Sequence, residues 1–129
     1  MTQGDYPQDH PAIRTTAMPA DTNPAGDIFG GWLMSQMDLA AGNVAARRAR
    51  GRCATVAVDS FTFHQPVKVG DEVSVFASIR HEGRSSMQIH VEAWRRSREG
   101  EDNQLVTRAT FVFVALDEHG RPRALPAAD

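Results

Sequence analysis

Hydrophobic and polar residues follow two different periods along the chain. Between Asp27 and Gly51 the apolar residues recur every three or four positions, which is typical of one long helix that ends near Arg50, with Gly51 as its stop. After Gly51 the period changes to two, and the stretches become rich in β-branched and aromatic residues, as in strands. The pattern predicts strands over residues 52–64, 72–81, 86–96 and 105–116, and a shorter extended segment over 12–19 that precedes a loop over 20–27.

The order of these elements predicts an α+β fold. One helix followed by four consecutive antiparallel strands leaves a sheet whose apolar face needs a cover, and the helix is the only cover available. The segment FVFVAL over 111–116 is apolar on both faces, so we expect this strand to be buried on both sides with the help of a second subunit. Residues 1–11 are polar and proline-rich, so the predicted division is a disordered tail over 1–11, one domain over 12–126 and a short tail over 127–129.

Composition and charge narrow the possible function classes. The chain has 129 residues, 41% of them hydrophobic, which is enough for one domain with a real core. A net charge of −2 gives no bulk attraction to nucleic acid or to an anionic membrane. One cysteine excludes an internal disulfide framework, and the five histidines have no metal-type spacing, so we expect no metal. There is neither a membrane-spanning apolar run nor a secretory signal pattern, which predicts a cytoplasmic protein.

Asp38 is the first candidate for chemistry. A helical projection places Gly31, Ser35 and Gly42 within about 60° of it, so Asp38 lies on a seam of small residues, with Arg47 nearly opposite on the solvated face. A partly desolvated carboxylate has a raised pKa and suits proton transfer. A structural role at the helix edge, paired with an arginine or a strand amide, fits the same pattern equally well.

Two adjacent glycines at the helix start are the second candidates. Gly30 and Gly31 are poor helix formers, which indicates that something comes close to the first turn. Free N–H groups at the positive end of the helix dipole hold an anion or a developing oxyanion. A thioester carbonyl held there, with Asp38 about two turns further on, would make a hydrolytic site. Tight helix–sheet packing explains the glycines about as well.

Other reactive side chains give weaker signals. Ser35 and Cys53 lack a histidine at a local spacing that would activate them, and Cys53 is better interpreted as a small core residue at a strand start. Asp59 is the second-choice carboxylate, and an outward polar position is the favoured interpretation for it.

Four stretches together resemble a known family. AMPADTNPAGDIFGGWLMSQMDLAAG, over 17–42, closely resembles the signature of the YciA-type acyl-CoA thioesterases of the hot-dog fold, which are related to the brain acyl-CoA hydrolases. The resemblance continues through TVAVDSFTFHQPVKVGDEV, GRSSMQIHVEAW and ATFVFVALDEHGRPRALP, and covers the chain from Ile13 to Pro126.

The resemblance implies a fold, an assembly and a set of site residues. In this family an antiparallel sheet wraps a long helix, two domains form one continuous sheet with sites at the subunit interface, and dimers often assemble into hexamers. The family's catalytic aspartate falls on Asp38, its oxyanion amides on Gly30 or Gly31, and an asparagine that reaches the site on Asn23. The turn that contacts coenzyme A falls on Gly83, Arg84, Ser85 and Ser86.

One position departs from the family pattern. Many relatives carry a basic residue before the proline of FHQP, where this chain has Gln65. If that residue holds a coenzyme A phosphate or an interface, the role must pass to others. The candidates are Arg84 and the arginines of the run over 47–52, which otherwise form a solvated helix end.

These observations lead to one favoured function and two alternatives. The favoured one is an acyl-CoA thioesterase that uses Asp38 as a general base on water or as a nucleophile through a transient anhydride, with no cofactor beyond the coenzyme A of substrate and product. It would act as a dimer or a trimer of dimers, without nucleic acid, membrane or metal as partner. A non-catalytic acyl-CoA sensor on the same fold is the first alternative, and a hot-dog hydratase the second. The loop DTNPAGDIFGG lacks the histidine that a hydratase needs.

Overall fold

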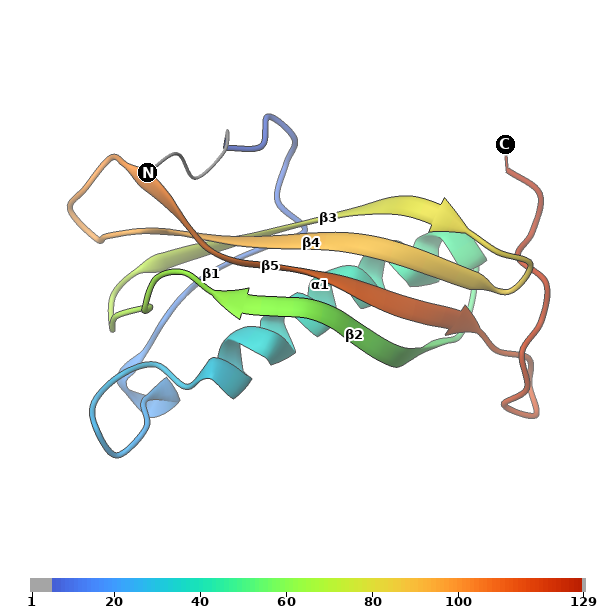
Figure 1. Cartoon of the computed structure of the whole chain (residues 1–129), viewed down its shortest axis with the longest axis horizontal. Helices are drawn as coiled ribbons and strands as arrows, with labels where there is room; N and C mark the ends of the chain where they lie inside the picture. Colours follow the sequence, from blue (N-terminus) through green and yellow to red (C-terminus); the bar gives the residue numbers. More distant parts are fainter. Residues whose placement is uncertain (1–5, 129) are drawn as a thin grey trace.

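A five-stranded antiparallel sheet lies across one long helix in the computed structural model, which describes residues 6–128 (Figure 1). The α+β hot-dog architecture predicted from the sequence is therefore confirmed. The strands stand in the order β1-β3-β4-β5-β2, and each neighbouring pair is antiparallel. The elements are β1 Ile13–Thr16, the 3-10 turn η1 Pro19–Asp21, α1 Gly30–Ala49, β2 Cys53–Phe63, β3 Glu72–Glu82, β4 Ser86–Arg96 and β5 Asn103–Ala115.

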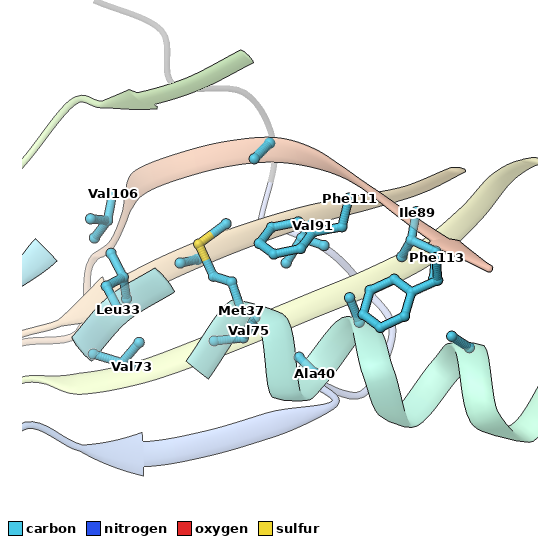
Figure 2. Packing of buried hydrophobic residues seen from close by; sticks show 14 of the residues in the cluster. Leu33, Met37, Ala40, Val73, Val75, Ile89, Val91, Val106, Phe111 and Phe113 are labelled. Carbon is cyan, nitrogen blue, oxygen red and sulfur yellow. The ribbon is translucent and has the colours of Figure 1, made fainter. Parts of the chain in front are cut away.

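The core lies between α1 and the inner face of the sheet (Figure 2). Leu33, Met37 and Ala40 recur at three- and four-residue spacing on the helix and are buried. They meet alternate residues of the three central strands, which point to one face because successive strand side chains alternate. These strand residues include Val73, Val75, Ile89, Val91, Phe111 and Phe113.

The sheet leaves β2 as an open edge. Within the described residues this strand pairs only with β5, and eight of its eleven residues are exposed. Val56 is 58% exposed, and Leu39, on the adjoining helix face, is 57% exposed. An exposed apolar edge strand is a ready template for pairing with another chain. On β5, Phe111 and Phe113 are buried against the helix, while Val112 and Val114 are half-buried on the outer face.

The helix ends differently from the prediction. Arg50, not Gly51, takes the left-handed conformation that closes the helix, with φ 54°. A Cβ atom at Gly51 would lie 2.9 Å from the guanidinium of Arg123, so this guanidinium would have to shift if position 51 carried a side chain. That guanidinium donates to the carbonyl oxygen of Ala49 at 2.8 Å and so caps the last turn.

Tyr6, the first described residue, packs against the outer face of the sheet. Residues 1–5 and 129, in the predicted tails, lie outside the described residues. Residues 6–11 form no helix or strand, yet Tyr6 makes edge-on ring contacts with Phe76 and Trp94, each at 5.3 Å between centroids. Arg14 donates a hydrogen bond to the Tyr6 hydroxyl at 3.1 Å. Aromatic packing therefore attaches the described part of this segment to the sheet.

Candidate active site

Asp38 stands at mid-helix beside the open edge strand. The Thr55 hydroxyl of β2 donates a hydrogen bond to Asp38 Oδ1 at 2.6 Å. The carboxylate opens into a hollow of about 290 Å³ that Met34, Val58 and Phe111 help to line. The seam of small residues predicted a partly desolvated Asp38, and this is wrong for the single chain, where Asp38 is exposed. Asp38 stands at the border of the buried helix face, since Ala41 and Ala45 at nearby positions are fully buried, and a covering partner would desolvate its carboxylate.

The first turn of α1 presents unpaired backbone donors. Trp32 and Leu33 donate their N–H groups to the Phe29 carbonyl oxygen, at 3.1 and 3.3 Å. Within the described residues, the N–H groups of Gly30 and Gly31 have no recorded acceptor. A Cβ atom on Gly31 would meet nothing within 4 Å, whereas one on Gly30 would lie 3.2 Å from Cζ of Phe63. Gly31 is therefore open to an approaching ligand, and Gly30 makes room for an aromatic ring.

The glycines and Asp38 do not form one site within a single chain. Gly30 and Asp38 are eight positions apart, and this separation is about 12 Å along a helix axis. A carbonyl held by the first amides is then beyond the reach of an attacking group on Asp38, which needs about 3 Å. The hollow at Asp38 also shares no lining residue with the pocket at Gly30. The two-turn spacing that suggested a complete hydrolytic site within one helix is thus too long.

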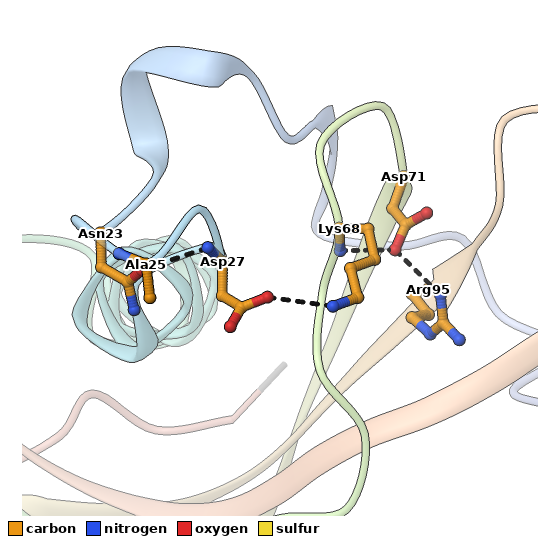
Figure 3. Close-up of polar contacts among 6 residues, drawn as sticks. All are labelled: Asn23, Ala25, Asp27, Lys68, Asp71 and Arg95. Atoms are coloured by element: carbon orange, nitrogen blue, oxygen red, sulfur yellow. Dashed lines mark hydrogen bonds and ion pairs between the residues drawn. The ribbon is translucent and has the colours of Figure 1, made fainter.

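Asn23 holds the loop that leads into the helix (Figure 3). Its side-chain carbonyl accepts the N–H groups of Ala25 and Asp27, at 2.9 and 3.1 Å. Asp27 in turn pairs with Lys68 of the loop before β3, at 2.9 Å. With its oxygen so engaged, Asn23 offers a ligand only the N–H groups of its side-chain amide.

The turn Gly83–Ser86 lies at the opposite end of the helix from the glycines. Arg48 forms a bidentate ion pair with Glu82 at 2.8 and 2.9 Å and donates to the Pro126 carbonyl, so it is engaged in structure. The hydrogen bond from Arg48 lowers the pKa of Glu82, although burial opposes this. Arg84 and Arg47 are exposed at the same end and remain candidates for an anionic ligand.

The other reactive side chains have ordinary structural positions. The Ser35 hydroxyl donates to the Trp32 carbonyl at 2.7 Å. Burial raises the pKa of the Cys53 thiol, against the charge of Arg123, which disfavours a thiolate nucleophile. Asp59 is exposed on β2, as its outward interpretation predicted.

Within residues 6–128 no group of three or more histidine, cysteine or acidic residues is placed to hold a metal, and no helix is long and apolar enough to cross a membrane.

Comparison with known proteins places this arrangement in a family. The thioesterase superfamily matches residues 25–101. The acyl-CoA thioester hydrolase YciA of Escherichia coli is 46% identical over 128 residues, which cover 97% of this chain and 97% of the relative. The chain belongs to the hot-dog thioesterase superfamily. Within the superfamily it groups with the YciA-type acyl-CoA thioester hydrolases, as the sequence resemblance predicted.

Two solved thioesterases have nearly the same fold. The hexameric thioesterase y2039 from Yersinia pestis is 47% identical with a TM-score of 0.90, over 95% of this chain and 100% of that one. HI0827, a hexameric broad specificity acyl-coenzyme A thioesterase solved as an aspartate-to-alanine mutant enzyme, is 45% identical with a TM-score of 0.88, over 92% of this chain and 88% of that one.

Two residues of this thioesterase were missed from the sequence. Thr55 lies seventeen positions after Asp38 and on a different element, β2. Its contact with Asp38 depends on β2 lying beside the helix. Phe63 ends the same strand and covers Gly30. The glycine pair itself was the only local signal, since it indicated a close approach without identifying the approaching residue.

Proposed function

We propose that this chain hydrolyses acyl-CoA thioesters to the free acid and coenzyme A. The observation that carries the proposal is the Asp38–Thr55 pair on the exposed helix face of a chain in the thioesterase superfamily. Asp38 removes a proton from water as the water oxygen bonds to the thioester carbon. The carbon–sulfur bond then breaks, and the proton passes to the departing thiolate. Direct attack by Asp38 through an anhydride, which water then opens, gives the same products.

The backbone amides at the helix start supply the second half of the site. N–H groups of Gly30 or Gly31 stabilise the negative charge that develops on the carbonyl oxygen, aided by the helix dipole. Asn23 lies in the loop just before them, and its side-chain amide donates to the thioester or orients the water. The turn Gly83–Ser86, with Arg84, contacts the coenzyme A moiety.

A second copy of the chain completes the site. Pairing of β2 with β2 of a second copy around a two-fold axis runs the two helices antiparallel. Gly31, Met34 and Asp38 lie along one exposed helix stripe, with Met34 between the other two. When two such stripes meet antiparallel near Met34, Gly31 of one protomer faces the partner's Asp38. The twelve-ångström gap within one chain then disappears, and each dimer carries two sites.

Assembly is tested by light scattering. The edge of β2 is exposed and apolar, and Val56 and Leu39 need a cover. Since the solved relatives y2039 and HI0827 are hexameric, we expect a trimer of dimers. A stable monomer at micromolar concentration would remove the shared site.

Activity is tested by free-thiol release from a panel of acyl-CoAs. Asp38→Asn keeps the side-chain shape and removes the base, so kcat should fall by about 10²–10⁴-fold with the fold intact. Glu99→Gln is the control, since Glu99 is an exposed carboxylate in the loop between β4 and β5, away from α1 and β2. A folded Asp38→Asn variant with turnover near wild type contradicts the assignment. Binding of acyl-CoA without turnover by the wild type would instead indicate the non-catalytic sensor.

A further inference from the structure

An apolar pocket of about 400 Å³ opens beside the first turn of α1. Ile28, Gly30 and Leu33 line one side, and Phe63, Val67 and Val106 line the other. We propose that this Gly30 pocket receives the aliphatic acyl chain of the substrate, and that the ring of Phe63 determines which chains enter. The inference rests on the proposed thioesterase function and adds to it the subsite that selects among acyl groups.

The floor of the Gly30 pocket suits a hydrocarbon chain. Leu33 is 1% exposed and Val106 is fully buried, so the bottom is formed by core side chains. A chain that enters exchanges water for these apolar groups, which is worth about 0.8 kcal/mol for each CH₂ buried. The pantetheine arm carries amides, and burying an amide without a partner costs free energy. The closed apolar end therefore takes the acyl side of the thioester and not the coenzyme A side.

The position of the pocket agrees with this orientation. Gly30 both lines the pocket and belongs to the turn whose free amides would hold the thioester oxygen. An acyl chain attached to that carbonyl starts at the pocket mouth. The exposed arginines Arg47 and Arg84, which could bind phosphates, lie toward the other end of a helix about 30 Å long. Within one chain, the apolar pocket and the exposed arginines thus lie toward opposite ends of the helix.

Phe63 stands at the rim of the pocket beside Gly30. Its ring is 48% exposed, yet its Cζ lies 3.2 Å from where a Cβ on Gly30 would stand. Phe61 packs against it with the ring planes tilted by 59° and the centroids 5.0 Å apart, but does not line the pocket. His64 and Gln65 also line the pocket and make this part of its wall polar.

The walls of the pocket are joined to each other beside the mouth. The Ile28 N–H donates to the Val67 carbonyl oxygen at 3.4 Å, and Lys68 pairs with Asp27 on the exposed side (Figure 3). These contacts link the two walls of the pocket. The size of the side chain at position 63 is the feature of the opening that a single substitution changes.

The test compares a branched and a straight substrate on three variants. Thiol release is measured with isovaleryl-CoA and butyryl-CoA, and the ratio of their kcat/KM values is the readout. Phe63→Ala widens the mouth and should raise this ratio by about tenfold, the lower end of what one methylene group is worth in an apolar pocket. Phe63→Trp should lower the ratio. Phe61→Ala is the matched control from the same strand and should leave the ratio within about twofold.

Each outcome decides the proposal. An unchanged ratio in Phe63→Ala overturns it, and so does an equal change in Phe61→Ala, which indicates general loosening. If Phe63→Ala does not fold, Phe63→Leu replaces it under the same criteria. A wild-type protein that releases no thiol from any acyl-CoA would contradict the proposed function instead. If the wild type hydrolyses acyl-CoA but substitutions of Phe63 leave the ratio of kcat/KM values unchanged, the proposed function stands and only the role of the Gly30 pocket is contradicted.

Discussion

Removing the carboxylate of Asp71 should destabilise the protein far more than removing that of Asp27. Asp71 is 3% exposed, and its Oδ2 accepts hydrogen bonds from the Lys68 N–H at 2.9 Å and from Arg95 Nη1 at 3.0 Å (Figure 3). Arg95 is itself mostly buried, and within the described residues its Nε has no partner. Asp71→Ala would leave this guanidinium without its counter-charge in a site that water barely reaches.

The size of the effect follows from this burial. Breaking a buried ion pair by removing one partner costs about 3–5 kcal/mol, because the remaining charge is uncompensated. At about 4 °C per kcal/mol for a chain of this length, Tm should fall by about 12–20 °C. Asp71→Asn retains an acceptor for the Lys68 N–H and should lower Tm by less than Asp71→Ala does.

Asp27→Ala is the matched control. Asp27 pairs with Lys68 at the same loop, but both side chains are more than half exposed, and such pairs contribute about 0–1 kcal/mol. The assay is thermal unfolding followed by circular dichroism at one protein concentration, since assembly makes Tm concentration-dependent. A loss below about 1 kcal/mol for Asp71→Ala, or an equal loss for Asp27→Ala, refutes the reasoning.

Two further predictions concern ligand binding and pH. Arg84→Ala should raise KM for acyl-CoA more than it lowers kcat, because a remote phosphate contact acts equally on ground and transition states, and the KM of the variant should depend less on salt. Arg98→Ala, at an exposed arginine near Gly70, is the control. Equal KM values for the two variants would count against a phosphate contact at Arg84. Burial alone would raise the pKa of Glu92, but hydrogen bonds from His90 and Trp94 and nearby positive charge lower it below 4.5 in balance. Glu92→Gln should therefore be less stable than wild type at neutral pH, and the difference in unfolding free energy should close as pH falls below 4.5; a difference independent of pH in denaturant titrations would contradict this.

Periodicity was sufficient to predict the elements and the main core. Val73 and Val75 on one strand and Leu33 and Met37 on the helix follow their periods, and each is buried as predicted. Phe76 breaks the alternation of its strand, and the structure explains it by a second small cluster on the outer face with Trp94. That cluster depends on contacts between distant segments, which a local pattern does not contain.

The candidate site was less accessible to sequence reasoning. The helical projection ranked Asp38 by the size of its neighbours, but its exposure depends on where the sheet stops covering the helix. Ala41 and Ala45 beside it are buried, whereas Asp38 lies at the border of the covered face and is exposed. The separation of eight positions between Gly30 and Asp38 was interpreted as two turns within reach of one thioester, although the rise of the helix puts these residues about 12 Å apart. On the proposed shared site, both errors have one cause, which is that half of the site belongs to another chain.

The central claim is that each active site combines Gly31 of one protomer with Asp38 of its partner, and mixed oligomers test it most directly. Asp38→Asn and Gly31→Leu are each inactive by this account, and an added side chain at Gly31 meets no atom within 4 Å of its Cβ in its own chain. The two variants are refolded together and assayed for thiol release, after light scattering has verified assembly of each one. Random pairing makes half of the dimers mixed with one intact site in two, so the account predicts recovery of about a quarter of the wild-type rate. A mixture no more active than its separate components would contradict it.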